Sequence, residues 1–115
     1  MSSFQPSPAQ AWLLLLIAGL LEIGWAVGMK STAGFTRWGP SAVVLVTALL
    51  SFYLLAVAMK ALPVGTAYAV WVGIGAAGAA VLGIVLFGEP ASLPRIASLL
   101  LIVAGVVGLR VFAVA

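Results

Sequence analysis

The chain has 115 residues, of which 65% are hydrophobic and only 6% are charged. Soluble domains carry about 25% charged residues, so this chain has too few charges to cover a water-facing surface. It has no Cys and no His, and its only acidic side chains are those of Glu22 and Glu89. This composition excludes disulfides, a Cys/His zinc site and a His-activated nucleophile. We therefore expect neither an enzyme nor a bound metal or cofactor.

Positive charge is scattered along the chain. The net charge of +3 arises from five basic residues: Lys30, Arg37, Lys60, Arg95 and Arg110. Proteins that bind nucleic acids gather basic residues into a patch or stripe, and no such cluster occurs in this sequence. We expect these side chains to anchor helix ends at the membrane surface, and we expect no nucleic-acid partner.

The first ten residues, MSSFQPSPAQ, are polar and uncharged and contain two prolines. This composition predicts that residues 1–10 form a disordered leader and that residues 11–115 form a single transmembrane domain. A secretory signal begins with a basic region, but Lys30 is the first basic residue in the chain. We therefore expect the first apolar run to be retained as a membrane span.

Four apolar runs follow the leader, at residues 11–29, 41–59, 62–87 and 96–115. About 20 helical residues cross the hydrocarbon core of a bilayer, and each run is close to that length. Strands of a membrane barrel alternate in hydrophobicity, whereas these runs do not. Helices also satisfy their own backbone hydrogen bonds, which lipid cannot do. The sequence predicts an all-α, multi-pass integral membrane protein with four transmembrane helices.

The distribution of charge gives little preference for one orientation in the membrane. Four spans place both termini and the turn at residues 60–63 on one side, together with Lys60 and Arg110. Lys30, Arg37 and Arg95 lie on the other side. Two basic residues against three give the positive-inside rule little to act on, so the pattern is compatible with insertion in both directions.

Glu22 lies about twelve residues into the first span, near the predicted middle of the bilayer. A charged side chain there costs about 2.5–3.5 kcal/mol, and intramembrane carboxylates usually mark ion or proton pathways. The alternative is a permanently protonated Glu22 that hydrogen-bonds to a neighbouring helix. Apart from Arg110 at a far helix end, the spans contain no basic residue that could act as a fixed counter-ion. We therefore expect a proton and a cationic substrate to compete for Glu22, which alternating exposure converts into antiport.

Helical spacing predicts the surroundings of this carboxylate. Gly19, Glu22 and Trp25 are three residues apart and share one helix face, so Gly19 leaves room above the carboxylate and Trp25 places a ring beside it. In the third span, Tyr68 and Trp71 are also three apart, and their rings can attract a cation. Packing between helices is the alternative role for both aromatic residues.

Ser51 lies midway along the second span. Its hydroxyl could bond to Glu22 or to the backbone of its own helix, and both alternatives remain open.

Small residues recur in the third and fourth spans. Glycines soften a helix, and a bend that supplies the alternating motion is expected at Gly73, Gly75 and Gly78. A small face lets helices approach closely in lipid, and the fourth span has such a face for dimer contact at Ser98, Gly105 and Gly108. Simple packing is the alternative for all six positions.

Four stretches resemble the small multidrug resistance transporters: GLLEIGWA (19–26), KSTAGFTRWGPS (30–41), SFYLL (51–55) and LPVGTAYAVWVGIG (62–75). The resemblance covers residues 12–111. It implies a dual-topology, antiparallel homodimer in a prokaryotic plasma membrane, held together by the fourth span. It also implies that Glu22 is the shared ligand of proton and substrate. The positions that match the family's pocket lining are Trp25, Ser51, Tyr68 and Trp71.

The residues around these motifs are similar to those of the family's guanidinium exporters. They include Ala26, Thr66 and the stretches GIGAAGAAVLGI (73–84) and FGEP (87–90). Guanidinium is planar and its N–H fork matches the two oxygens of a carboxylate. The resemblance therefore favours a proton-coupled exporter of guanidinium and small guanidinyl cations. Val72 departs from the pattern, because the family usually has Ser or Thr there, and this removes a polar group beside the pocket.

Two alternatives remain. A transporter of the same fold could export quaternary ammonium compounds and other bulky cations as a polyspecific multidrug exporter. From another class of protein, a non-transporting membrane scaffold or accessory subunit would not need the charge of Glu22.

Overall fold

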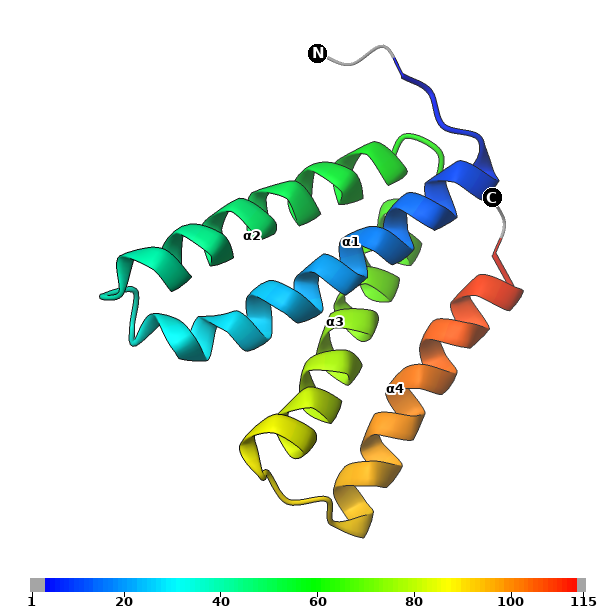
Figure 1. The fold of residues 1–115 in the computed structure, drawn as a ribbon. Helices are drawn as coiled ribbons and strands as arrows, with labels where there is room; N and C mark the ends of the chain where they lie inside the picture. Colours follow the sequence, from blue (N-terminus) through cyan, green and yellow to red (C-terminus); the bar gives the residue numbers. More distant parts are fainter. Residues whose placement is uncertain (1–3, 114–115) are drawn as a thin grey trace.

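The structure, a computed structural model, describes residues 4–113 and consists of helices joined by short connections. The long helices are α1 (Pro8–Gly28), α2 (Trp38–Ala58), α3 (Val64–Phe87) and α4 (Leu93–Val111), and a short 3-10 helix, η1 (Met29–Thr32), follows α1 (Figure 1). Each of the four long helices is long and apolar enough to cross a membrane. The described part of the chain is therefore all-helical, as the sequence predicts.

Local capping sets the start of α1 three residues before the expected span. Ser7 accepts a hydrogen bond from the Gln10 backbone at 3.2 Å, and the Gln10 side chain accepts one from the Ser7 backbone at 2.9 Å. This reciprocal capping box satisfies two backbone N–H groups at the helix end, and Pro8 occupies the first turn, where its missing N–H has no cost. Residues 8–10 of the expected leader are therefore helical, while residues 1–3 lie outside the described residues.

The other helix ends also differ from the expected spans by a few residues. α2 begins at Trp38 and α4 at Leu93, each three residues early, and α4 has a proline in its first turn. α3 begins at Val64 because Pro63 forms its N-cap. α4 ends at Val111, and residues 114–115 of the expected fourth span lie outside the described residues.

α1 lies at the centre of the helix arrangement, with contacts to both α2 and α3, whereas α2 and α3 touch each other only slightly. Figure 1 shows α2 beside α1, α3 crossing behind α1, and α4 alongside α3. The buried core gathers where the first three helices meet, and it comprises Ala11, Leu15, Ala18, Leu55, Ala58, Leu62, Ala67, Val70 and Trp71. None of the residues of α4, all of which the structure describes, is buried.

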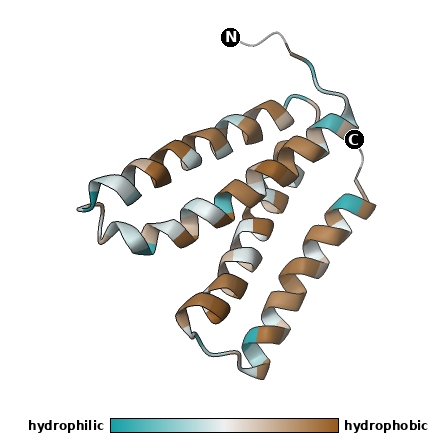
Figure 2. Cartoon of the chain, in the orientation of Figure 1, coloured by the Kyte–Doolittle hydropathy of each residue, from teal (hydrophilic) through white to brown (hydrophobic). Residues whose placement is uncertain are grey.

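The outward faces of the helices are as apolar as their contacts. Hydrophobic colours cover most of each helix in Figure 2, and many large apolar side chains are exposed, among them Leu13, Leu49, Val85 and Leu101. A helix that is hydrophobic on all sides belongs in a large core or a membrane. A protein of this size has no such core, so these faces fit lipid, and the chain is a multi-pass membrane protein.

Glycines set the close approach of the helices. A Cβ atom added at Gly73 would lie within 3 Å of the Val106 side chain on α4, and one at Gly78 would lie equally close to Ile23 on α1. Small residues at such points let helix backbones approach, which drives helix association in lipid. α3 is a single continuous helix, so bending at its glycines remains a prediction.

Substitution of Gly73 by Leu should destabilise the packing of α4 on α3. Val106 is stiff and β-branched, so it cannot easily move away from the new side chain. We expect the free energy of unfolding to fall by about 1–3 kcal/mol, as in other overpacked cores, in an SDS titration in mixed micelles. Gly24→Leu is the matched control, because a Cβ at Gly24 meets no described atom within 4 Å. Equal effects of the two variants would contradict the assigned contact.

Candidate functional site

The site centres on Glu22, which α1 presents to α3. Its carboxyl group lies directly against Gly75, where a Cβ atom would overlap it. The Glu22 Oε1 atom is buried and has no hydrogen-bond partner among residues 4–113. Within the same residues, the only salt bridge joins Arg95 to Glu89, at 2.6 Å. Glu22 is therefore an acidic group among apolar helices, and no cationic side chain of residues 4–113 forms a salt bridge with it.

A short hydrogen-bond chain fixes the helix turn that carries Glu22. Trp71 Nε1 donates to Ser51 Oγ at 2.9 Å, and Ser51 Oγ donates to the backbone carbonyl of Ala18 at 2.7 Å. Both side chains are buried. Ala18 precedes Glu22 by one helical turn, so the chain links α3 through α2 to the backbone of α1 at the site.

The partner of the Ser51 hydroxyl is neither of the two expected from the sequence. The hydroxyl has one hydrogen to donate, and it donates that hydrogen to the carbonyl of Ala18, not to Glu22 or to its own helix. The physical reason is close packing: α1 presents the small residues Ala18 and Gly19, both buried, so that Ser51 reaches the α1 backbone.

Four aromatic rings from α1, α2 and α3 form a continuous row, and α1 also carries Glu22. The Trp25 and Phe52 ring centroids are 6.0 Å apart, those of Phe52 and Trp71 are 5.7 Å apart, and those of Trp71 and Tyr68 are 5.7 Å apart. The first two pairs meet edge to face, the geometry that aromatic pairs favour. The structure thus joins Trp25 of α1 to Trp71 and Tyr68 of α3 through Phe52. Helical spacing suggested only that Trp25 shares a face of α1 with Glu22, and that Tyr68 and Trp71 share a face of α3.

Phe52 is the member of the row that helical spacing did not single out. It follows Ser51 directly and bridges Trp25 and Trp71 through its ring. The sequence carried one signal for it, because Phe52 belongs to the SFYLL stretch (51–55). The Phe52 ring extends from α2 and contacts Trp25 of α1 and Trp71 of α3.

Gly19 has a different surrounding from the one expected. The open space predicted above the carboxylate is occupied by the Ile74 side chain, which would lie within 3 Å of a Cβ atom on Gly19. The residue that makes room for the carboxyl group is Gly75 on α3.

Val72, the position at which the sequence departs from the family pattern, is 38% exposed.

The small face of α4 takes no part in this site within one protomer. Ser98 is exposed and donates to the Pro94 carbonyl of its own helix at 2.8 Å. A Cβ atom added at Gly105 or Gly108 would meet no described atom within 4 Å. These three residues remain candidates for contact with another chain.

The arrangement has the features of a site for an organic cation. The carboxyl group supplies one negative charge when ionised, and the neighbouring ring faces attract cations. The helices shield the Oε1 atom of Glu22 from solvent, and a lower local dielectric strengthens the attraction between charges. A proton and a cation can each neutralise the same group.

The hydrogen bond between Trp71 and Ser51 should contribute measurably to stability. We expect the variants Trp71→Phe and Ser51→Ala to show a coupling energy of about 0.5–2 kcal/mol in a double-mutant cycle, the range for side-chain hydrogen bonds between membrane helices. The free energy of unfolding in an SDS titration is the measurement. Strictly additive effects would mean that the two side chains do not interact.

Comparisons with known proteins identify the relatives of this chain. The family model described as Small Multidrug Resistance protein matches residues 10–102. A protein named guanidinium exporter from Yersinia pseudotuberculosis is 62% identical over 100 residues, which are 87% of this chain and 96% of that protein. The guanidinium exporter of Escherichia coli is 60% identical over 87% of this chain and 95% of its own length. That of Salmonella typhimurium is 58% identical over 90% of this chain and 98% of its own length.

Proposed function

The chain belongs to the small multidrug resistance family, and from that premise we propose that it is a proton-coupled exporter of guanidinium and small guanidinyl cations. Its relatives are named as transporters and not as enzymes. The observation that carries the proposal is the carboxyl group of Glu22, which rests against Gly75 and whose buried Oε1 atom has no hydrogen-bond partner among the described residues.

The chemistry of the site suits guanidinium. The ion is planar, permanently charged and carries parallel N–H groups that bond both oxygens of one carboxylate. It also stacks on aromatic faces, which the row from Trp25 through Phe52 and Trp71 to Tyr68 offers. The relatives named as guanidinium exporters support this substrate over quaternary ammonium compounds.

Competition for Glu22 provides the coupling. A protonated carboxyl group has no charge to attract guanidinium, and a carboxylate that holds guanidinium disfavours protonation. Protons therefore enter the site when the cation leaves it. If the site opens alternately to the two sides of the membrane, an inward proton gradient drives the cation outward. The same competition means that the apparent affinity for guanidinium falls as the pH falls.

The proposed functional unit is an antiparallel homodimer in a prokaryotic plasma membrane. Two observations support it. The basic residues are divided almost evenly between the two membrane sides, which permits insertion in both directions. In addition, α4 buries none of its described residues within the protomer and leaves its small face at Gly105 and Gly108 open. The family resemblance implies that two Glu22 side chains line one central site of this dimer and that the α4 helices hold the two copies together.

Glu22→Gln should abolish coupled transport and leave assembly unchanged. The amide keeps the shape of the side chain and its capacity for hydrogen bonds, but it can neither release a proton nor carry charge. The measurement is the current that guanidinium induces on a solid-supported membrane, which should fall to background, while size-exclusion chromatography shows the wild-type oligomer.

For the unmodified protein, guanidinium should evoke a current and tetrapropylammonium should not. The guanidinium current should also require a higher concentration for half-saturation at lower pH.

Glu89→Gln is the matched control, because it removes the other acidic side chain, which pairs with Arg95 in the connection between α3 and α4. This variant should retain the guanidinium current. Full activity of Glu22→Gln would contradict the exchange mechanism and favour a scaffold or accessory subunit. A response to tetrapropylammonium alone would favour the quaternary ammonium exporters.

A single cysteine at position 91 should show both orientations in the membrane. The chain has no natural cysteine, and Ala91 is exposed in the connection between α3 and α4. In intact cells of a bacterial host, an impermeant maleimide should label about half of the Ala91→Cys protein, and detergent should make the rest reactive. Labelling of all or none of the protein before permeabilisation would contradict dual topology.

A further inference from the structure

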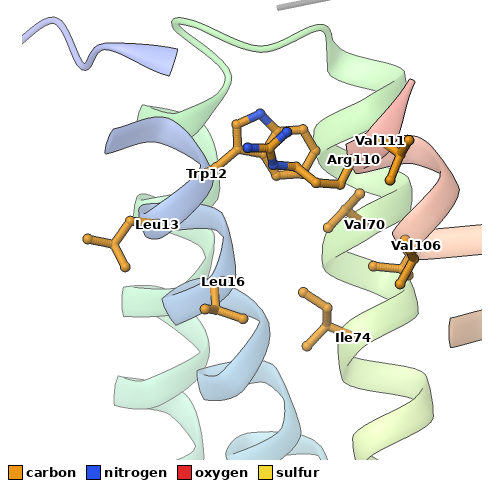
Figure 3. Close-up of a pocket in the computed structure, with 9 residues that line it drawn as sticks. Trp12, Leu13, Leu16, Val70, Ile74, Val106, Arg110 and Val111 are labelled. Carbon is orange, nitrogen blue, oxygen red and sulfur yellow. The ribbon is translucent and has the colours of Figure 1, made fainter. Parts of the chain in front are cut away.

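A groove on the outside of the helix arrangement lies apart from the Glu22 site. Its volume is about 390 Å³, and aliphatic side chains from three helices line it, including Leu13 and Leu16 of α1, Val70 and Ile74 of α3, and Val106 and Val107 of α4. Figure 3 shows Leu16 of α1 on one side of this space and Val70, Ile74 and Val106 of α3 and α4 on the other. Leu13 and Leu16 are 57% and 47% exposed, so the groove is open on the outside of the chain.

A cation closes one end of this groove. The Arg110 guanidinium lies over the Trp12 ring, 5.1 Å from its centroid, and Figure 3 shows the two side chains stacked at the end of the groove. Trp12 is in the second turn of α1, and Arg110 is in the last turn of α4. Both therefore lie at the ends of membrane spans, where tryptophan and arginine side chains reach the lipid headgroups.

Arg110 has no acidic partner among the described residues, where the only salt bridge joins Arg95 to Glu89. An occupant of this groove must therefore be apolar along its length and negatively charged at the interfacial end. A cationic substrate with an apolar tail would be repelled by Arg110. An uncharged lipid would fill the groove and leave the guanidinium without a counter-ion.

We propose that the groove holds one acyl chain of an anionic phospholipid, whose phosphate binds Arg110 beside Trp12. The small face of α4, with Gly105 and Gly108, lies on a different side of that helix from Val106, which packs on Gly73 of α3. A second copy seated on the small face therefore leaves the groove free for lipid. The site needs only that the chain lies in a membrane, so it is independent of the transported substrate.

Native mass spectrometry of the purified full-length protein tests this site. The protein is equilibrated with equal amounts of phosphatidylglycerol and phosphatidylcholine that have identical acyl chains, and the retained lipids are counted. Phosphatidylglycerol should be retained about fivefold over phosphatidylcholine, the preference that one interfacial cation confers. Arg110→Gln should abolish this preference, and Arg110→Lys should keep most of it because the charge remains.

Lys60→Gln is the matched control for charge. Lys60 lies on the same membrane side in the four-span topology but does not line the groove, and it donates to the Phe4 carbonyl. This variant should keep the preference for phosphatidylglycerol. An equal loss in Lys60→Gln and Arg110→Gln would assign the preference to diffuse surface charge and overturn the proposal, as would an unchanged preference in Arg110→Gln.

Leu16→Trp tests the groove itself. The larger side chain should fill the space, and we expect it to reduce the number of retained phosphatidylglycerol molecules without changing the oligomeric state. Normal retention of lipid by this variant would overturn the proposal. A change of oligomeric state with normal lipid retention would show that a second copy occupies the groove, which would also overturn it.

Discussion

An acidic side chain without a protein counter-ion, inside helices that face hydrocarbon, is the constraint on which the rest of the structure depends. Water would solvate Glu22, but lipid does not, so the protein must supply space for whichever cation or proton neutralises it. Gly75 supplies that space on α3, because any side chain there would displace the carboxyl group. The bond from Ser51 to the Ala18 carbonyl then fixes the helix turn that presents the acid.

The same environment explains how the helices are held together. Lipid tails are as apolar as leucine, so burying leucine between helices gains little, and close backbone approach becomes the main source of attraction. Contacts at Gly73 and Gly78 join α3 to its neighbours on both sides. α1 serves as the central helix because it contacts both α2 and α3. α4 remains at the edge, packed on α3, and reaches α1 through the contact of Arg110 with Trp12.

Composition was sufficient to predict the four spans, the short connections and the isolated acid, because a bilayer imposes its thickness on any helix that crosses it. The helix ends were less predictable, since the capping of Ser7 and Gln10 depends on local hydrogen bonds that apolar runs do not report. The partners of Ser51 and the position of Phe52 required the structure. Spacing shows which residues share a face of one helix, but it does not show how far that helix slides or turns against the next.

The bond between Trp71 and Ser51 has a mechanical consequence. Because water cannot replace a broken hydrogen bond in a dry interior, separating α3 from α1 and α2 at this level is costly. It follows that the helices joined by the chain from Trp71 to Ala18 shift most easily as one rigid body. Relative movement of the helices is then easiest at the edge of the chain, between α4 and α3. The Arg95–Glu89 salt bridge spans the loop that connects these two helices.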